Sequence, residues 1–155
     1  MERLYRLLYP MRVCLITSRH GDKENVMAAS WVFPMSMDPP LFGVSVAEKR
    51  YSCDLIRKGG CFGINIPHPD IEEATLICGT NSGRDVDKFD KAGLTKEETN
   101  HVPVIKECPV SIVCEVVGEM VAGDHIVFIG KAVETKKRFE AKGLYQVKGD
   151  KFVSL

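Results

Sequence analysis

The sequence lacks both an excess of charge of one sign and any long apolar run. Its 155 residues contain 21 Lys plus Arg and 21 Asp plus Glu, so no net positive field is present to attract a nucleic-acid backbone. The longest apolar stretches, such as Ile126 to Ile129, are far shorter than the roughly 20 residues of a membrane-spanning helix. We therefore expect neither a nucleic-acid partner nor a membrane span.

Signals for export and for cysteine chemistry are also missing. Residues 1 to 10 lack the continuous apolar segment and the small-residue cleavage site of a secretory signal, so we expect a cytoplasmic protein. The six cysteines form no C-x-x-C pair, and several lie in apolar runs. We therefore predict that the cysteines are buried free thiols and that the protein has no metal site. The alternative is that some of them form a metal-binding or redox pair.

What the chain does have is the composition of one globular domain. Hydrophobic residues make up 45% and charged residues 27%, which is typical of folded proteins. At this length roughly 70% of the surface of the unfolded chain can be buried. We predict a single domain over residues 1 to 155.

Short β-rich segments dominate the chain, separated by turn residues. The predicted strands are Val13 to Thr17, Asn25 to Phe33, Leu41 to Val46, Cys61 to Ile66, Val110 to Val117, His125 to Thr135, Tyr145 to Val147 and Phe152 to Leu155. The two long strands after residue 110 should pair as antiparallel neighbours, and the last two should form a closing hairpin.

Two short helices are predicted from capping residues and spacing. Ser52 can cap a helix that runs through Lys58 and ends at a left-handed Gly59, and Asp70 can cap Ile71 to Ile77, ended by Gly79. Many strands with few helices favour an antiparallel barrel or sandwich. A Rossmann fold is disfavoured because strands and helices do not alternate and no G-x-G-x-x-G or P-loop string occurs.

Several ordered segments resemble one known family. They are Tyr9-Pro10, Asn25 to Trp31, Ser36 to Pro40, Ser45 to Ser52, Phe62 to Asn65, Cys78-Gly79, Ser82-Gly83, Asp87 to Phe89, and Gly123 to His125 followed by Gly130. Together they resemble the flavin reductase-like, flavoredoxin-type family over roughly residues 8 to 135. The resemblance implies a mainly β fold, the FMN-binding split β-barrel, which is a Greek-key-like antiparallel barrel.

The resemblance also implies where FMN would bind. Arg50, Tyr51 and Ser52 lie where a strand turns into a helix, so a guanidinium, two hydroxyls and free amides would meet the phosphate. The alternative is a capped helix with a solvated Arg50. Lys88 would also reach the phosphate, or else be an ordinary solvated charge on a helix.

The flavin ring needs a flat wall and backbone hydrogen bonds. The predicted wall residues are Met27, Ala28, Ala29 and Ser30, with Ser45, Val46 and Ala47 on the next strand and Gly79, Ser82, Gly83 and Phe89 closing over the cofactor. For the second strand, the alternative is an alanine-rich core strand packed under a helix.

His125 is the predicted catalytic residue. In the resembling family this position lies near the flavin ring, and an imidazole can manage a proton near neutral pH. The alternative is a packed strand histidine without a chemical role.

The resemblance implies an oxidoreductase in which NADH or NADPH reduces FMN, which then passes electrons to a small-molecule or protein acceptor. A noncatalytic FMN electron carrier is the second hypothesis, and a barrel that has lost its cofactor is the third. A homodimer is expected from the same resemblance. The segment after Thr135 is short compared with the cofactor-covering tail of longer family members, which leaves open whether NADH or NADPH can dock at the site.

Overall fold

A computed structural model of the protein describes residues 2–155, so only the first residue of the predicted domain lies outside it. The strands are β1 Met11–Arg12, β2 Cys14–His20, β3 Lys23–Ala29, β4 Val32–Ser36, β5 Leu41–Ala47, β6 Cys61–Ile66, β7 Lys96–Glu97, β8 Val104–Ile105, β9 Val110–Ala122, β10 His125–Lys137, β11 Leu144–Lys148 and β12 Lys151–Ser154. The helices are α1 Tyr51–Gly59, α2 Glu72–Thr80 and α3 Lys88–Ala92, with 3₁₀ turns η1 Leu4–Leu8 and η2 Pro69–Ile71.

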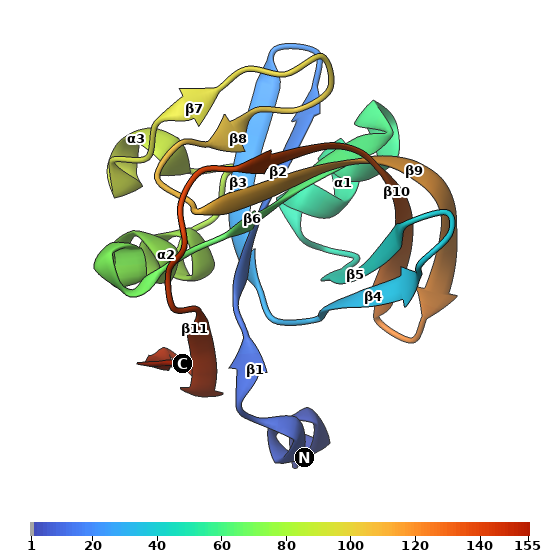
Figure 1. The fold of residues 1–155 in the computed structure, drawn as a ribbon. Coiled ribbons are helices and arrows are strands. Elements are labelled where there is room, and N and C mark those ends of the chain that lie inside the picture. The colour runs from blue at the N-terminus through green and yellow to red at the C-terminus, as the bar shows by residue number, and fades with distance from the viewer. Residues whose placement is uncertain (1) are drawn as a thin grey trace.

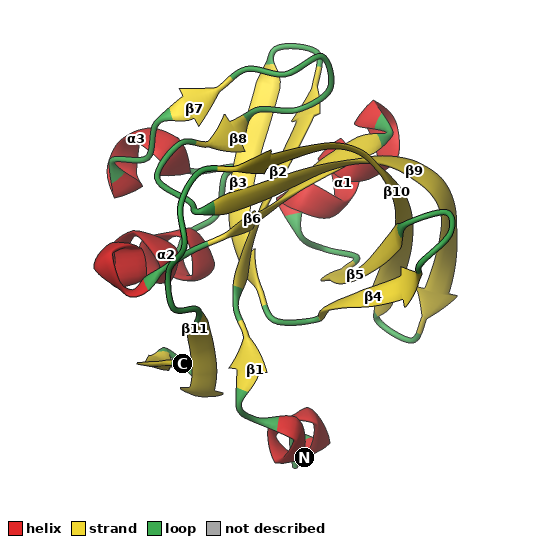
Figure 2. Ribbon diagram, in the orientation of Figure 1, coloured by secondary structure: helices red, strands yellow, loops and turns green. Residues whose placement is uncertain are grey.

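One seven-stranded antiparallel sheet, in the order β3-β2-β6-β9-β10-β5-β4, curves around a central core (Figures 1 and 2). Its core residues are Cys14, Ile16, Val44, Val46, Cys53, Ile56, Phe62, Ile64, Cys114, Ile126 and Phe128. They come from β2, β5, β6, β9 and β10 and from α1, which closes the barrel. The predicted mainly β split barrel is confirmed.

Gly130 shows how the core constrains β10. A Cβ atom at this position would lie 2.5 Å from Cζ of Phe62 and 2.7 Å from Cβ of Cys114. The register of β10 against β9 also shifts between Ile129 and Gly130, as at a β-bulge, which bends a strand. The glycine therefore makes room for the Phe62 ring where the sheet curves.

A second core lies between the sheet and helices α2 and α3, which pack beside β2 and β3 (Figure 1). It contains Leu15, Val26, Ala74, Cys78, Phe89, Leu94, Ile105 and Cys108. Both faces of the β2-β3 hairpin are thus covered.

Most predicted strands are confirmed, and the two long ones extend further than expected. β9 and β10 are antiparallel neighbours, and β11 and β12 form the closing hairpin. One boundary was wrong, because β3 ends at Ala29 and Phe33 belongs to β4. β3 and β4 occupy opposite ends of the strand order, so the chain leaves the sheet between them.

The predicted helix ends were wrong at both helices. α1 begins at Tyr51 with Arg50 as its N-cap and no side-chain cap, and it ends at Gly59, followed by the left-handed C-cap Gly60, whose φ is 74°. Gly59 is instead required for close approach, because a Cβ there would lie 1.9 Å from the carbonyl oxygen of Arg19.

α2 begins after a 3₁₀ turn that contains Asp70, so Asp70 does not cap it. Gly79 lies inside α2, which continues to Thr80. The helix α3 and the short pair β7-β8 had no equivalent in the prediction.

The cysteines are free, as predicted, and all are buried except half-buried Cys61. Residues 2–155 contain no cluster of three or more potential metal-ligating His, Cys, Asp or Glu side chains. None of the helices described is long and apolar enough to cross a membrane.

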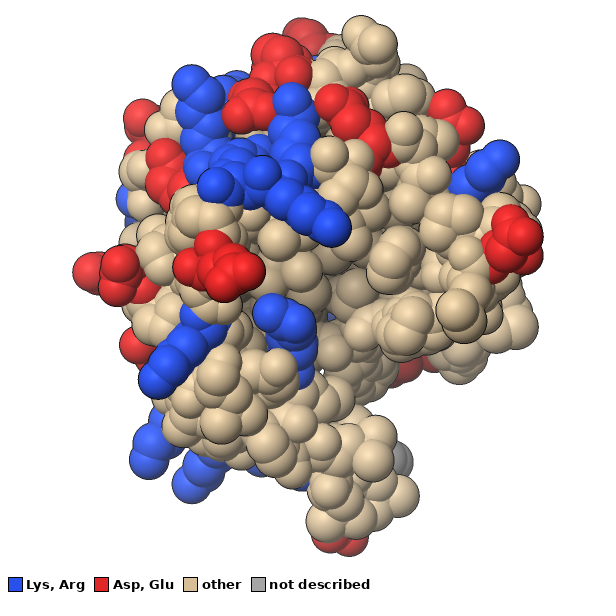
Figure 3. All heavy atoms as spheres, viewed as in Figure 1, with Lys and Arg blue, Asp and Glu red and all other residues tan. Residues whose placement is uncertain are grey.

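Charges of both signs are mixed on the face shown in Figure 3. Lys and Arg side chains gather in its upper part, with acidic side chains among them. This face therefore carries a cluster of basic side chains that is bordered by acidic ones.

Candidate functional site

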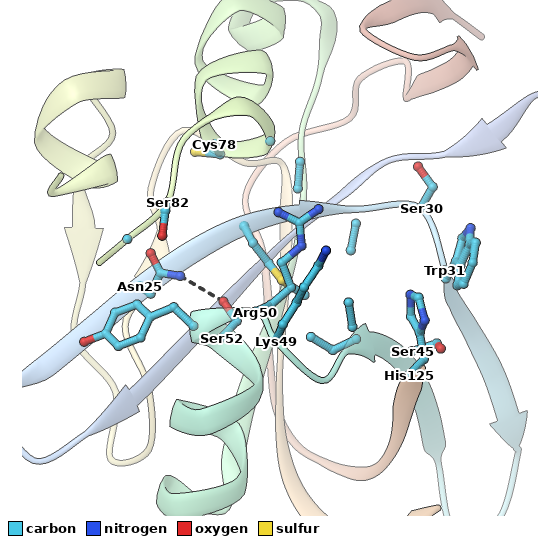
Figure 4. Close-up of a pocket in the computed structure, with 18 of the residues that line it drawn as sticks. Asn25, Ser30, Trp31, Ser45, Lys49, Arg50, Ser52, Cys78, Ser82 and His125 are labelled. Carbon is cyan, nitrogen blue, oxygen red and sulfur yellow. Dashed lines mark hydrogen bonds between the residues drawn. The ribbon is translucent and has the colours of Figure 1, made fainter. Parts of the chain in front are cut away.

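A cavity of about 410 Å³ opens between β3, the end of β5, the first turn of α1, the end of α2 and the start of β10 (Figure 4). Its volume is in the range of small-molecule sites, roughly 300–1,000 Å³. Every predicted site residue except Phe89 lines it. The structure thus brings together side chains that are far apart in sequence.

The first turn of α1 forms one end of the cavity. Arg50 has an extended backbone, and no side chain caps the helix, so the amides of Tyr51 and Ser52 have no intrahelical acceptor. The guanidinium of Arg50 and the ammonium of Lys49 point in the same direction beside the cavity (Figure 4). This end therefore offers amides and two cations to an anion.

A buried hydrogen bond holds Ser52 at this end. The side-chain amide of Asn25 donates to Oγ of Ser52 at 2.9 Å (Figure 4), and both residues are nearly inaccessible to solvent. Ser52 keeps its own hydroxyl proton free to donate, because it is the acceptor in this bond.

Gly83 packs closely against the residues around this hydrogen bond. A Cβ at Gly83 would lie 2.2 Å from Oδ1 of Asn25 and 2.9 Å from Cδ2 of Tyr51. Only glycine permits the loop to pass this close to both residues. The predicted pair Ser82-Gly83 thus lies at the cavity, with Ser82 adjacent to the glycine.

Lys88 is a buried cation in the cavity wall. Its side chain is 5% exposed, and Nζ donates to the backbone oxygen of Cys78 at 2.9 Å. Burial, aided by the nearby positive charge of Arg50, lowers the pKa of Lys88 to about 8. The alternative of a solvated helix charge is excluded by this burial.

Phe89 does not reach the cavity, which corrects its predicted position. Its ring is 4% exposed and belongs to the second core. The ammonium of Lys96 lies 5.4 Å from the ring centroid on the other side of α3. Adjacent positions of a helix point in different directions, and here Lys88 lines the cavity while Phe89 packs into the second core.

The second half of β3 forms the long wall. Met27, Ala28, Ala29 and Ser30 line the cavity opposite Gly79 of α2, where a Cβ would lie 3.2 Å from Cβ of Ala28. The small side chains let the helix and the strand approach each other. The hydroxyl of Ser30 donates to Oε1 of Gln146 at 2.7 Å, so the C-terminal hairpin does reach the site.

The far end is formed where β5 pairs with β10. In this register Ala47 lies opposite His125 and Val46 opposite Ile126. Ser45, Val46 and Ala47 all line the cavity, and Val46 also belongs to the main core. The wall here is part of the rigid barrel.

His125 is held from two sides. Its ring stacks on Trp31 with centroids 4.6 Å apart and planes at 29°, and Nδ1 lies 2.7 Å from Oδ1 of Asp124. The hydrogen bond with His125 lowers the pKa of Asp124. Tyr5 contacts the other side of this group, edge to face with Trp31 at 5.2 Å.

The cavity is electropositive. Its charged lining residues are Lys49, Arg50, Lys88 and Asp124. Within residues 2–155, no acidic side chain lies within ion-pair distance of the three cations. The pocket is therefore suited to an anionic ligand.

Sequence reasoning missed several lining residues: Tyr5, Tyr9, Asn25, Trp31, Lys49, Cys78, Asn81, Asp124 and Gln146. Five of them lie inside the segments that carry the family resemblance, namely Asn25, Trp31, Lys49, Cys78 and Asp124. Their closeness in sequence to predicted site residues is the signal that could have identified them. Tyr5 and Gln146 give no local signal, because only the packing of the two chain ends brings them to the cavity.

Comparisons with known proteins agree with this geometry. The family model described as flavin reductase like domain matches residues 4–152. An uncharacterised protein of Pyrococcus abyssi is 42% identical over 137 residues, which cover 88% of this chain and 80% of that protein.

Two solved structures have a similar fold. Flavoredoxin from Methanosarcina acetivorans has a TM-score of 0.87 at 26% identity, with 96% of this chain and 86% of that chain covered. The FMN-binding protein from Thermus thermophilus has a TM-score of 0.90 at 23% identity, covering 99% of this chain and 91% of that chain. The chain therefore belongs to the flavin reductase-like family.

Proposed function

We propose that the cavity binds FMN and that the protein passes electrons through the bound flavin. The observation that carries this proposal is one cavity with an electropositive polar end, a wall of small residues and an aromatic far end. This combination fits a flat ring joined to a phosphate dianion. Two features support the fit: the close packing at Gly83, where a Cβ would have no room, and the hydroxyl proton of Ser52, which is free to donate.

The phosphate would lie at the first turn of α1. Arg50 supplies a planar guanidinium, Lys88 a desolvated ammonium, and Ser52 and Ser82 hydroxyl groups, all in the same wall. Hydrogen bonds to charged groups are each worth about 1.5–3 kcal/mol. The ring would lie along Ala28 and Ala29, where small side chains leave the β3 backbone within reach.

When bound, flavin supplies hydride and electron transfer, while the protein orients it and sets its potential. His125 is the residue proposed to hold or move the accompanying proton. With Nδ1 hydrogen-bonded to Asp124, Nε2 is the ring nitrogen left for proton exchange. Stacking on Trp31 keeps the ring in one orientation.

We propose that NADH or NADPH is the electron donor and that a small molecule or a protein is the acceptor. The second candidate is a noncatalytic electron carrier, which is favoured by the likeness to a protein named flavoredoxin. Anaerobic stopped-flow mixing of the FMN-loaded protein with each nucleotide separates the two. Rapid bleaching of the visible flavin absorbance supports the enzyme, and no bleaching with either nucleotide supports the carrier.

Cofactor binding itself is tested with a matched pair of arginines. Arg50→Ala should weaken FMN binding by about 1.5–3 kcal/mol, because it removes a cation from the phosphate. Arg57 lies on the exposed side of α1 in an ion pair with Glu119, so Arg57→Ala should leave the affinity unchanged. A parent protein that stays folded but is colourless after incubation with excess FMN and removal of the free flavin would overturn the proposal and leave the cofactor-free barrel.

We also propose a homodimer. The edge strand β4 exposes Phe33 and Met35, and η1 exposes Leu7 and Leu8. An apolar edge strand favours pairing with another chain, and a second copy is the usual partner. Sedimentation should give twice the monomer mass of 17.3 kDa; a monomer that retains FMN would contradict this.

The cytoplasmic location stays a prediction.

A further inference from the structure

Lys88 is a buried cation with an incomplete set of acceptors. Its Nζ donates to the backbone oxygen of Cys78, yet an ammonium has three donors. Within residues 2–155, Nζ of Lys88 makes no second hydrogen bond, and no carboxylate lies within ion-pair distance of it. Two N–H donors are therefore without a protein acceptor in the wall of the cavity, and this arrangement is costly for a desolvated charge.

The residues that face Lys88 from neighbouring elements do not relieve this cost. Cys78 of α2 is a neutral thiol, because burial raises its pKa to about 11. Arg50 of the β5-α1 turn is a cation and repels the ammonium. The charged groups of β3, which packs against α3, are exposed Lys23 and half-buried Glu24, and Glu24 is already paired with two other cations.

The acidic groups of α3 itself are also turned elsewhere. The carboxylate of Asp87 accepts from the backbone nitrogen of Asp90 at 3.2 Å and so caps the helix. Asp90 is exposed, and Lys91 donates to Oδ1 of Asn81. The carboxylates of α2, Glu72 and Glu73, are exposed in its first turn and form no ion pair with Lys88. The side of Lys88 that is open to a further acceptor is the cavity, which it lines.

We propose that entry of a phosphate dianion into this cavity is coupled to uptake of a proton by Nζ of Lys88. This inference rests on the proposed binding of FMN and adds a proton linkage to it. In the empty site the buried ammonium lacks acceptors and loses its proton to solvent in mildly alkaline solution. The phosphate oxygens supply the missing acceptors, so the bound state retains the charged form.

The linkage predicts a proton count that calorimetry measures. Above neutrality the phosphate of FMN is already a dianion, since its second pKa is about 6, so any proton taken up belongs to the protein. FMN is titrated into apo-protein at pH 8.5 in two buffers of different ionisation enthalpy. With the pKa of Lys88 near 8 in the empty site, about 0.75 proton should be taken up per FMN.

Ligand and variant controls separate the linkage from general binding effects. Riboflavin, which lacks the phosphate, should bind without proton uptake. Lys88→Met should bind FMN at least tenfold more weakly and take up no proton. Lys88→Arg keeps a charge that does not titrate, so it should recover affinity without proton uptake. Lys58→Met, at an exposed position of α1, should behave like the parent.

The possible failures are distinct. If the parent binds FMN with no proton uptake, or if Lys88→Arg shows the same uptake as the parent, the linkage is wrong and FMN binding stands. If riboflavin causes the same uptake as FMN, the phosphate is not responsible and the linkage is again wrong. If the parent does not bind FMN at all, the proposed function fails and the linkage fails with it.

Discussion

Replacing Gly83 by alanine tests the geometry of the phosphate end most directly. The added Cβ would lie 2.2 Å from Oδ1 and 2.6 Å from Cγ of Asn25, far inside van der Waals contact. The Asn25 side chain must move, and the hydrogen bond that it donates to Ser52 at 2.9 Å breaks. Because Asn25 and Ser52 are buried, both partners lose a bond that water cannot replace.

The magnitude follows from that single bond. Breaking a buried hydrogen bond and leaving a polar group without a partner costs about 1–3 kcal/mol. We expect FMN to bind Gly83→Ala roughly 5- to 150-fold more weakly, with a Tm that is also lower. Asn25→Ala should have an effect of similar size, since it removes the same bond. The double variant should then be little worse than either single variant.

The assay is a titration of FMN fluorescence at neutral pH with parent, both single variants and the double variant. Gly118→Ala is the matched control, because its added Cβ would meet only Cδ1 of Ile129 at 3.6 Å, an ordinary contact. An unchanged affinity in Gly83→Ala, or fully additive effects in the double variant, would refute the reasoning.

Three further predictions concern the core, the buried lysine and the histidine. Gly130→Ala places a Cβ 2.5 Å from the Phe62 ring, so thermal unfolding should show about 1–3 kcal/mol of destabilisation. Relative to Lys88→Met, the parent apo-protein should gain about 3 kcal/mol in free energy of unfolding as pH rises from about 8 to 10.5, because the folded protein releases the proton of Lys88 before the unfolded chain does. Denaturant unfolding of both proteins measures this difference, in which the opposing effect of the buried thiols Cys14, Cys78, Cys108 and Cys114 cancels, since burial raises their pKa values in both proteins. His125→Gln should retain FMN but slow reduction by nucleotide by about 100-fold or more, and an unchanged stopped-flow rate would remove His125 from the proton step.

The strands could be predicted because their pattern is local. β-branched and apolar runs between turn residues identify β2, β5, β6, β9 and β10, and the His125 strand is confirmed as the neighbour of the Val110 strand. Helix ends are harder to predict from the sequence, because a helix cap depends on which backbone N–H group is left without an acceptor in the folded protein. At Gly59 the residue type reflects an approach by the Arg19 carbonyl, a contact far away in sequence that no local rule contains.

The sequence by itself determined the class of the protein and most of its candidate site. Residue types alone predicted only a β-rich domain, and it is the resemblance of ordered motifs to the flavin reductase-like family that identified the wall from Met27 to Ser30 and the turn from Arg50 to Ser52 as site segments. Only the tertiary structure decided which side of α3 faces the cavity, where Lys88 lies in the wall and Phe89 in the core. It also decided that the chain ends bring Tyr5 and Gln146 to the cavity. The physical reason is that burial and contact depend on packing between distant segments, whereas residue type and spacing are carried by each segment alone.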